Sequence, residues 1–367
     1  MQRKICNMTN SLHLFSPFTL RDITFRNRIA VSPMCQYSCE DGFASDWHLV
    51  HLGSRAVGGA GLVMVEATAV TEDGRITYGD HGLWKDEHIA GLKRITAFIK
   101  SQGAVPGIQI GHAGRKASCQ LPWEGGMCIP VDKGGWQIVA PSAVAFNEGD
   151  PVPHALSKTE ISDITQAFIN TARRALKAGF EVLELHSAHG YLLHEFLSPL
   201  ANHRRDEYGG SFENRIRLVR EVTDAVRTVW PMHLPLFMRI SASDWKEGGW
   251  TEDDSVKLAS IVRDRGVDLI DCSSGGIIPH VKIPNIPGYQ VPFAERIKRD
   301  SGIPTGAVGL ITDAKQADDI IRSHKADMVL LAREFLRDPY WPLHAARELG
   351  VDMKPPVQYE RAFAKQK

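Results

Sequence analysis

An alternation of short apolar runs with longer amphipathic segments limits the fold of this chain more than any other feature. Eight short apolar runs are each followed by a segment with helical periodicity. The runs expected as strands are 29–32, 62–66, 105–110, 182–185, 236–240, 269–271, 304–307 and 328–331. Strands that alternate with helices pair in parallel, and eight such units close into a barrel. We therefore expect a single α/β domain over residues 1–367, built as a (β/α)₈ TIM barrel.

The segments between the runs carry recognisable helix signals. Ser157 and Glu160 form a capping box, and Gly179 closes the helix that they open. The expected helices are 46–58, 88–102, 157–179, 214–229, 251–264, 292–299, 313–324 and 334–344. One helix after each strand is the connection that a parallel barrel needs.

Three segments lie outside this repeat. Residues 18–25 alternate in polarity about a short turn, which predicts an N-terminal hairpin that forms a lid under the barrel. The connection 111–156, after the third strand, is too long for a plain loop, and we expect an excursion that covers the mouth of the barrel. Residues 1–11 are expected to form a loose tail, with either Met1 or Met8 as the start.

Charge and cysteine usage exclude several classes of protein. The chain has 43 basic and 43 acidic residues, so neither nucleic acid nor an anionic membrane surface is an expected partner. No apolar run reaches the roughly 20 residues that a membrane span needs. The six cysteines are scattered without a repeated Cys-x-x-Cys spacing, so we expect no metal site and a reducing, cytoplasmic location.

Polar side chains gather where the expected strands end, which is where barrel enzymes carry their active sites. His186, His189 and Tyr191 follow the run 182–185, and Gly190 allows a sharp turn between them. Three groups that can donate hydrogen bonds therefore converge at one strand terminus. Because unpaired buried polar groups are costly, this cluster indicates a ligand site rather than packing.

Other strand ends indicate a cofactor with a phosphate tail and a ring that accepts electrons. Residues 306–309, and then Ala332 and Arg333, fit a phosphate site at the last two connections of a barrel. Arg239 cannot lose its proton, so it would place a fixed positive charge beside a ring that becomes anionic, as reduced flavin does. Gln109 could bond the pyrimidine edge of that ring.

These residues belong to motifs that resemble the old yellow enzyme family of flavin mononucleotide ene-reductases. The resemblance runs from about Leu14 to the C-terminus. The matching motifs are Pro33-Met34-Cys35-Gln36-Tyr37, Trp47-His48-x-x-His51, Glu66-Ala67-Thr68, Gln109-x-x-His112-x-Gly114-Arg115, His186-x-x-His189-Gly190-Tyr191 and Asn202-x-Arg204-x-Asp206-x-Tyr208-Gly209-Gly210-Ser211-x-Glu213-Asn214-Arg215. Cys35 and the C-terminal Gln358-Tyr359-Glu360-Arg361 resemble the bacterial thermophilic-like branch of that family.

The resemblance implies a bound flavin mononucleotide (FMN), NADPH or NADH as the hydride donor, and a small electrophilic alkene as the substrate. Residues implied to contact the flavin are Pro33, Met34, Cys35, Ala67, Gln109, Arg239, Gly309, Ala332 and Arg333. His186 and His189 would hold the carbonyl or nitro oxygen of the substrate. Tyr191 would protonate the α carbon after flavin N5 delivers hydride to the β carbon, and Tyr37 would help to bind the activating group.

The C-terminal tail, residues 351–367, carries a further implied contact. Two prolines follow the last helix, and we expect an extended segment in which Tyr359, Arg361 and Phe363 project to the same side. The related branch sends its matching arginine into the neighbouring subunit's active site. The resemblance therefore implies a homodimer or homotetramer in which Arg361 binds substrate in trans; a tail docked on its own subunit is the alternative.

Two other functions fit parts of the pattern. A His-x-x-His pair can bind a metal, so His186 and His189 could serve a metal-dependent barrel lyase or hydrolase. The second is a protein that binds flavin or electrophiles without turnover.

Overall fold

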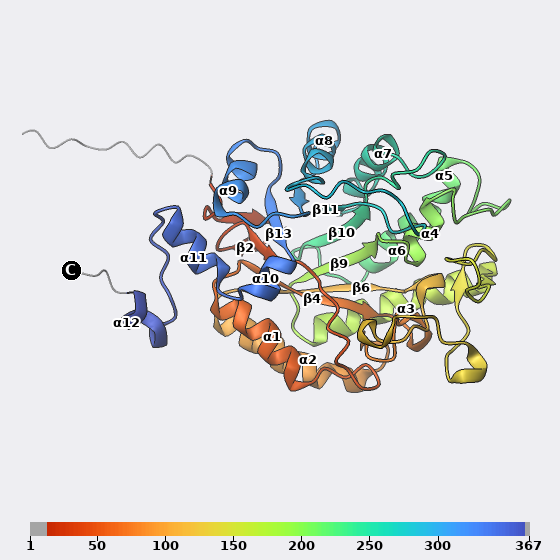
Figure 1. Ribbon diagram of the computed structural model, residues 1–367, viewed down its shortest axis with the longest axis horizontal. Coiled ribbons are helices and arrows are strands. Elements are labelled where there is room, and N and C mark those ends of the chain that lie inside the picture. Colours follow the sequence, from red (N-terminus) through yellow and green to blue (C-terminus); the bar gives the residue numbers. More distant parts are fainter. Residues whose placement is uncertain (1–12, 364–367) are drawn as a thin grey trace, which may run out of the picture.

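Eight parallel strands form a closed barrel in the computed structural model, which describes residues 13–363 (Figure 1). The barrel strands are β3 (Ile29–Val31), β4 (Leu62–Ala69), β6 (Val105–Gly111), β9 (Val182–Ser187), β10 (Leu236–Ser241), β11 (Leu269–Ser273), β12 (Thr305–Ala307) and β13 (Met328–Leu331). They pair in that order, and β13 pairs with β3 to complete the ring. The expected TIM barrel is confirmed. The expected tail 1–11, with Met1 and Met8, lies outside the described residues.

The outer helices cover the barrel because each buries one apolar face. They are α1 (Asp46–Val57), α2 (Ile89–Ser101), α3 (Lys158–Lys177), α6 (Arg217–Arg227), α7 (Glu252–Arg263), α8 (Val291–Ser301), α9 (Ala314–Arg322) and α11 (Trp341–Glu348). In α3, Ile161, Ile164 and Phe168 are buried at helical spacing. The capping box at its start is present, since the Ser157 side chain accepts the backbone N–H of Glu160.

Two helix predictions need correction, and one observed helix was not predicted. The helix expected over 214–229 is interrupted at Ile216 and divides into α5 (Phe212–Arg215) and α6. The helix expected over 334–344 divides into α10 (Arg333–Arg337) and α11, because Pro339 cannot continue a helix through its own position. A short helix that the periodicity did not indicate, α4 (Leu192–Leu197), follows the histidine cluster.

The N-terminal hairpin closes the bottom of the barrel. Its strands β1 (Phe18–Leu20) and β2 (Ile23–Phe25) pair antiparallel. Phe25 is fully buried among residues at or near the starts of the barrel strands, and its ring centroid lies 6.3 Å from that of Phe237. The expected lid under the barrel is confirmed, and the floor of the interior is apolar.

Higher in the barrel, the inward positions become polar. Side chains alternate between the two faces of a strand, so Phe237 and Arg239 point to the same side of β10. Gln109 donates to Glu184 across β6 and β9 at 2.8 Å, and all these polar side chains are buried. This alternation explains why Gln109 and Arg239 lie inside otherwise apolar runs: they face the interior, near the C-terminal ends of the strands.

The excursion 111–156 lies beside those C-terminal ends (Figure 1). It consists of short 3₁₀ turns and two short strands, β7 (Val139–Ala140) and β8 (His154–Ala155). Arg115 donates to the backbone oxygen of Ile277. Lys116 donates to the backbone oxygens of His189 and Gly276 at 2.9 and 3.2 Å. The start of the excursion is therefore bound to the loops that follow β9 and β11.

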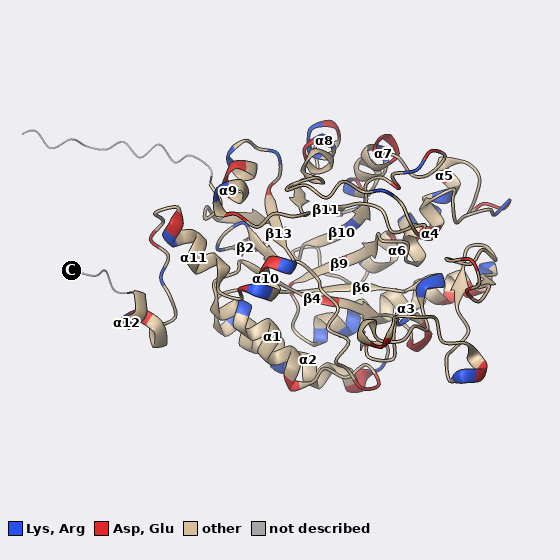
Figure 2. Cartoon of the chain, viewed as in Figure 1, with Lys and Arg blue, Asp and Glu red and all other residues tan. Residues whose placement is uncertain are grey.

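Charged residues of both signs are interspersed on the outer helices, and Figure 2 shows this on α7, α8 and α10. None of the helices in the described chain is long and apolar enough to cross a membrane.

Candidate active site

The two histidines and the tyrosine that follow the 182–185 run lie together at the top of the barrel. β9 extends to Ser187, so His186 belongs to the strand and not to the loop after it. The His186 ring packs edge-on to His189 and to Tyr191, with centroids 5.2 and 4.9 Å away. Tyr191 is the N-cap residue of α4, so the start of this helix fixes the backbone position from which the phenol side chain extends.

The sharp turn that brings these rings together depends on Gly190. Its φ is +73°, and a Cβ there would lie 2.1 Å from the backbone oxygen of Gly276. Its N–H donates to Nδ1 of His194 at 2.9 Å, and the buried His194 pairs with Asp244 at 3.0 Å. His194 therefore supports the turn from within the core.

Burial keeps both imidazoles neutral. Burial, and next the charge of Arg239, lowers the pKa of His186 and of His189 well below the usual range. A neutral imidazole carries one N–H. Nδ1 of His186 accepts the N–H of Ala188 at 3.3 Å, so its proton lies on Nε2. Burial likewise raises the pKa of Tyr191 well above its usual range, and the phenol stays protonated.

His189 differs from His186 in its hydrogen bonding. Its Nε2 lies 2.7 Å from Oγ of Ser273. The Ser273 hydroxyl also donates to Oε1 of Gln290 at 3.4 Å, and that oxygen accepts from Ser274 at 2.6 Å as well. His189 is therefore bound to a serine that it shares with Gln290, whereas His186 is bound to a backbone N–H.

The loop after β3 carries Cys35 and Tyr37 toward the same cluster. Burial raises the pKa of the Cys35 thiol, and hydrogen bonds with the Ala67 backbone and the Tyr37 side chain act against that rise. Tyr37 has a φ of +51° and packs edge-on against Trp123 of the excursion, with centroids 6.1 Å apart. The loop thus connects an expected flavin contact with an expected substrate contact.

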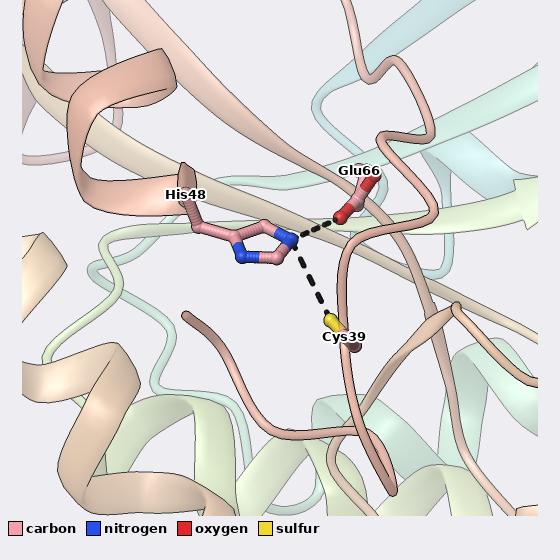
Figure 3. A group of neighbouring side chains, drawn as sticks. All are labelled: Cys39, His48 and Glu66. Atoms are coloured by element: carbon pink, nitrogen blue, oxygen red, sulfur yellow. Dashed lines mark hydrogen bonds and ion pairs between the residues drawn. The ribbon is translucent and has the colours of Figure 1, made fainter. Parts of the chain in front are cut away.

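A buried network of hydrogen bonds holds this loop in position. Figure 3 shows the His48 imidazole between the Glu66 carboxylate and the Cys39 thiol, at 2.9 and 3.5 Å. Glu66 also accepts the backbone N–H of Gln36, which lies between Cys35 and Tyr37. A change at His48 or Glu66 would therefore alter the position of the loop.

Within the described residues, Cys39, His48 and Glu66 are the one group whose ligand atoms all lie within 4.8 Å, as a metal site would require. Nδ1 of His48 accepts the backbone N–H of Ser45 at 3.0 Å, so its proton lies on Nε2 and is donated to Glu66. A metal on Nε2 would have to displace that proton. The group works as a hydrogen-bond network that caps α1 and holds the 33–37 loop.

Besides a small cavity lined by His186 and Tyr191, a second cavity, of about 200 Å³, opens at the ends of β12 and β13. Its lining includes the expected flavin contacts Arg239, Gly309, Ala332 and Arg333. Gly309 has a φ of +117°, and a Cβ there would lie 2.8 Å from the Gln290 side chain. Because Gly309 has no side chain, its backbone groups are accessible, and together with the three arginines that line the cavity (Arg239, Arg333 and Arg337) they suit a phosphate-bearing ligand.

Between the cluster and this cavity lies a polar layer of side chains, which forms the floor of the site above the apolar floor of the barrel and has atoms that make no aligned hydrogen bond with the described residues. Nε of Arg239 lies 3.1 Å from Asp271, but neither that nitrogen nor either Asp271 oxygen makes an aligned hydrogen bond. One oxygen of Glu184 is also unpaired, and burial raises the pKa of Glu184 to about 8. Buried polar atoms without partners are costly. A flat polar ring above this floor, with its phosphate in the second cavity, fits these residues.

Two residues at the site were not anticipated. Lys116 lies with its ammonium 5.2 Å from the centroid of the Tyr191 ring, and it directly follows the Gln109-to-Arg115 motif, which could have drawn attention to it. Gln290 is buried and donates to the backbone oxygen of Val308 at 3.1 Å in the wall of the second cavity. Nothing in the sequence around Gln290 marked it.

Arg361 does not join the other expected residues. The tail is not extended: a 3₁₀ turn (Val357–Tyr359) and the helical turn α12 (Glu360–Phe363) occupy it, so that expectation is wrong. Pro356 is the N-cap residue of the turn, with ψ of 143°, and the helical conformation begins at Val357. Figure 1 shows α12 on the opposite side of the molecule from the excursion.

Comparison with known proteins agrees with this geometry. Residues 13–351 match the NADH:flavin oxidoreductase / NADH oxidase family. The NADPH dehydrogenase of Geobacillus thermodenitrificans (strain NG80-2) is 52% identical over 352 residues, covering 95% of this chain and 98% of that protein. That of Bacillus subtilis (strain 168) is 48% identical over 352 residues, covering 95% and 99%.

Solved structures give the same result at lower identity. Morphinone reductase in complex with tetrahydroNAD is 27% identical with a TM-score of 0.75, covering 94% of this chain and 92% of that one. The old yellow enzyme homologue from Zymomonas mobilis is 26% identical with a TM-score of 0.77, covering 94% of each chain.

The barrel and its polar upper end are thus those of a flavin-dependent oxidoreductase. This chain belongs to the NADH:flavin oxidoreductase / NADH oxidase family, and the predicted resemblance to old yellow enzymes is confirmed. FMN is its cofactor and NAD(P)H its electron donor. The metal-dependent and non-catalytic alternatives are set aside by this membership.

The buried carboxyl of Glu195 generates a prediction about stability. Its Oε1 accepts the backbone N–H of Arg115 at 2.9 Å, its other oxygen is unpaired among the described residues, and burial raises its pKa from 4.5 to about 8. Between these values the folded state holds a proton that the unfolded state has released. Stability therefore falls as pH rises through this window, by up to about 1.4 kcal/mol for each pKa unit.

Glu195→Gln stays neutral, so the variant should lose less stability than the wild type between about pH 5 and about pH 8. Thermal unfolding of the holoenzyme at both pH values measures the difference. The exposed Glu87→Gln serves as the matched control and should keep the wild-type pH dependence. If Glu195→Gln also keeps it, the carboxyl is not the group that titrates.

Proposed function

We propose that this NAD(P)H-dependent flavoenzyme reduces activated C=C bonds, with His186 and His189 holding the activating oxygen and Tyr191 supplying the proton. The observation that carries the proposal is the convergence of two neutral imidazoles and one protonated phenol above a polar floor. When bound, FMN accepts hydride from the nicotinamide and passes it from N5 to the β carbon of the substrate.

The imidazoles bind the carbonyl or nitro oxygen of an enone, maleimide or nitroalkene. Hydride addition at the β carbon moves negative charge onto that oxygen, and N–H donors already in place stabilise it. His186 donates from Nε2, because its Nδ1 accepts the N–H of Ala188, and His189 supplies the second N–H donor. Since both rings are neutral, they bind the oxygen without protonating it outright.

Tyr191 completes the reaction by protonating the α carbon. Its raised pKa means that the phenol holds its proton at neutral pH. It also means that the phenolate left behind is a strong base, which takes a proton back from water. Lys116, near the ring face, would stabilise that phenolate.

Residues of the 33–37 loop and of the second cavity bind the cofactor in this proposal. Flavin contacts come from Pro33, Met34, Cys35, Ala67, Gln109, Arg239, Gly309, Ala332 and Arg333. Tyr37 binds the activating group of the substrate beside them. We assign the phosphate to Arg333 and the backbone at Gly309, because they line one cavity with Arg239.

A homodimer or homotetramer is part of the proposal, with Arg361 acting in the neighbouring subunit. Its support is the position of α12, which lies away from the mouth of its own barrel (Figure 1). Val357, Tyr359 and Phe363 are exposed there, and an apolar surface of this kind favours burial against a partner. We also propose a cytoplasmic location, where the unpaired state of the five described cysteines would persist.

Tyr191→Phe removes the proton donor and leaves the ring in place. It should slow reduction of a simple enone by about a hundredfold or more, the usual contribution of a general acid. Flavin reduction by NADPH should remain near the wild-type rate. Stopped-flow measurement of the two half-reactions separates these effects, and an unchanged oxidative half-reaction would remove Tyr191 from the mechanism.

His186→Ala and His189→Ala should each weaken the binding of para-substituted phenols, whose oxygen mimics the enolate. Losing one donor at such a site costs roughly 3 kcal/mol. Titration of the phenol, followed by the change in flavin absorbance, measures the loss. His203→Ala, an exposed histidine outside the cluster, is the control. Equal affinity in both variants and wild type would contradict the oxyanion role.

Arg361→Ala should impair substrate binding while flavin content stays intact. Mixing this variant with a His186→Ala, His189→Ala double variant creates hybrids in which one site can hold all three residues only if Arg361 acts in trans. Activity above that of the separate variants is the expected result. No gain after verified subunit exchange would contradict sharing, and Lys354→Ala controls for loss of a tail cation.

A further inference from the structure

Two cysteines of the excursion face each other across a short antiparallel contact that serves no step of the proposed reaction. Cys119 and Cys128 form an isolated antiparallel bridge. The flanking backbone bonds run from Gln120 N–H to Met127 O at 2.8 Å and from Ile129 N–H to Ser118 O at 2.6 Å. The two cysteines themselves exchange no backbone hydrogen bond, so they form the non-hydrogen-bonded type of pair.

This type of pair has the dimensions of a disulfide. Opposed residues at such positions have Cα atoms about 4.5 Å apart and side chains on one face. Disulfides join cysteines whose Cα atoms are about 4.4–6.8 Å apart. Both thiols already approach one acceptor, the backbone oxygen of Ala117, at 3.6 Å for Cys119 and 4.0 Å for Cys128.

The pair lies in the wall of a cavity of about 260 Å³ beside the site. Tyr37 and Lys116 line the same cavity. Trp123, which packs on Tyr37, belongs to the loop between the two cysteines. Both cysteines are half-buried, so a small reagent can reach them from the cavity. A bond between them would fix the loop that carries Trp123.

We propose that Cys119 and Cys128 form a reversible disulfide that tethers the 119–128 loop, with a peroxide as the oxidant. One thiol attacks the peroxide O–O bond, giving a sulfenic acid and water. The second thiol then displaces the sulfenic hydroxyl as water and forms the S–S bond. In total two thiols are oxidised and one hydrogen peroxide is reduced to two waters. A dithiol reductant reverses the bond by exchange.

The environment sets the rate of this oxidation. Burial raises the pKa of Cys119 to about 12 and also raises the pKa of Cys128. The reactive thiolate is therefore scarce at neutral pH, and the first step is slow. The second step is intramolecular between neighbours and outpaces it. The disulfide therefore forms only under sustained exposure to peroxide.

Trypsin provides a direct assay, because cleavage after Lys116 and Lys133 releases the peptide 117–133. This peptide contains Cys119 and Cys128 and no other cysteine. Holoenzyme is treated with hydrogen peroxide, then denatured and alkylated with iodoacetamide. The expected peptide lacks both alkyl groups and is lighter by two hydrogens than the dithiol. Treatment with dithiothreitol before alkylation should restore two alkylated cysteines. This readout does not depend on the proposed reaction or its substrate.

Single variants provide the matched controls. In Cys119→Ser and Cys128→Ser the remaining cysteine should carry an alkyl group or a sulfur oxyacid, with no intrapeptide bond. Hydrogen exchange over 119–128 should slow on oxidation of the wild type and stay unchanged in either variant. The proposal is overturned if the wild-type peptide keeps two alkyl groups, or if Cys35 and Cys39 join instead.

Discussion

The pairing of β13 with β3 is the interaction on which the rest of the structure depends. It joins the last barrel strand to the first, so the sheet has no free edge in the main ring. Closure forces the C-terminal ends of all eight strands into one circle. Residues as far apart in sequence as Tyr37, Tyr191 and Arg333 then lie around one mouth.

Placing polar residues around one mouth has an energetic cost, because charged side chains are buried in the barrel interior. Arg239, Glu184 and Asp271 are buried in a layer where a barrel of purely structural value would place aliphatic side chains. Arg239 and Asp271 form an ion pair, but several polar atoms of the three residues make no aligned hydrogen bond among the described residues. Unfavourable burial of polar groups occurs at functional sites, where the stability of the surrounding fold compensates for it. Here the apolar floor closed by Phe25 and Phe237 lies directly below.

The fold could be predicted because it rests on a repeated local pattern. Each strand and helix signal is weak, but eight in succession leave one architecture. The position of the site could be predicted for the same reason, since a closed barrel brings the polar residues at its strand ends together. The predictions fail at two places where prolines stand. Pro339 interrupts an apolar helical pattern, and the adjacent prolines Pro355 and Pro356 predict an extended tail although a helical turn begins directly after them.

Other parts of the site could not be predicted because they depend on contacts between distant segments. Gln290 lines the second cavity only because the segment before α8 returns to the barrel mouth. The hydrogen bond between His48 and Glu66 joins the first turn of a helix to a strand, and nothing in the sequence around either residue indicates its partner. The role of Gly190 as a turn was foreseeable, but its contact with Gly276 was not.

The attachment of the excursion has a consequence for how the enzyme tolerates its medium. The side chains of Arg115 and Lys116 bind backbone oxygens of Ile277, His189 and Gly276, and the Glu195 carboxyl that accepts the Arg115 backbone N–H is neutral in acid, since burial raises its pKa to about 8. Backbone oxygens carry no charge that acid can neutralise, and buried contacts are screened little by salt. Moderate acid or high ionic strength, which loosens surface ion pairs, should leave the mouth of the barrel organised. Alkali acts differently: burial lowers the pKa of Lys116 to about 8, so a rising pH removes one of the two cationic anchors while Arg115 remains.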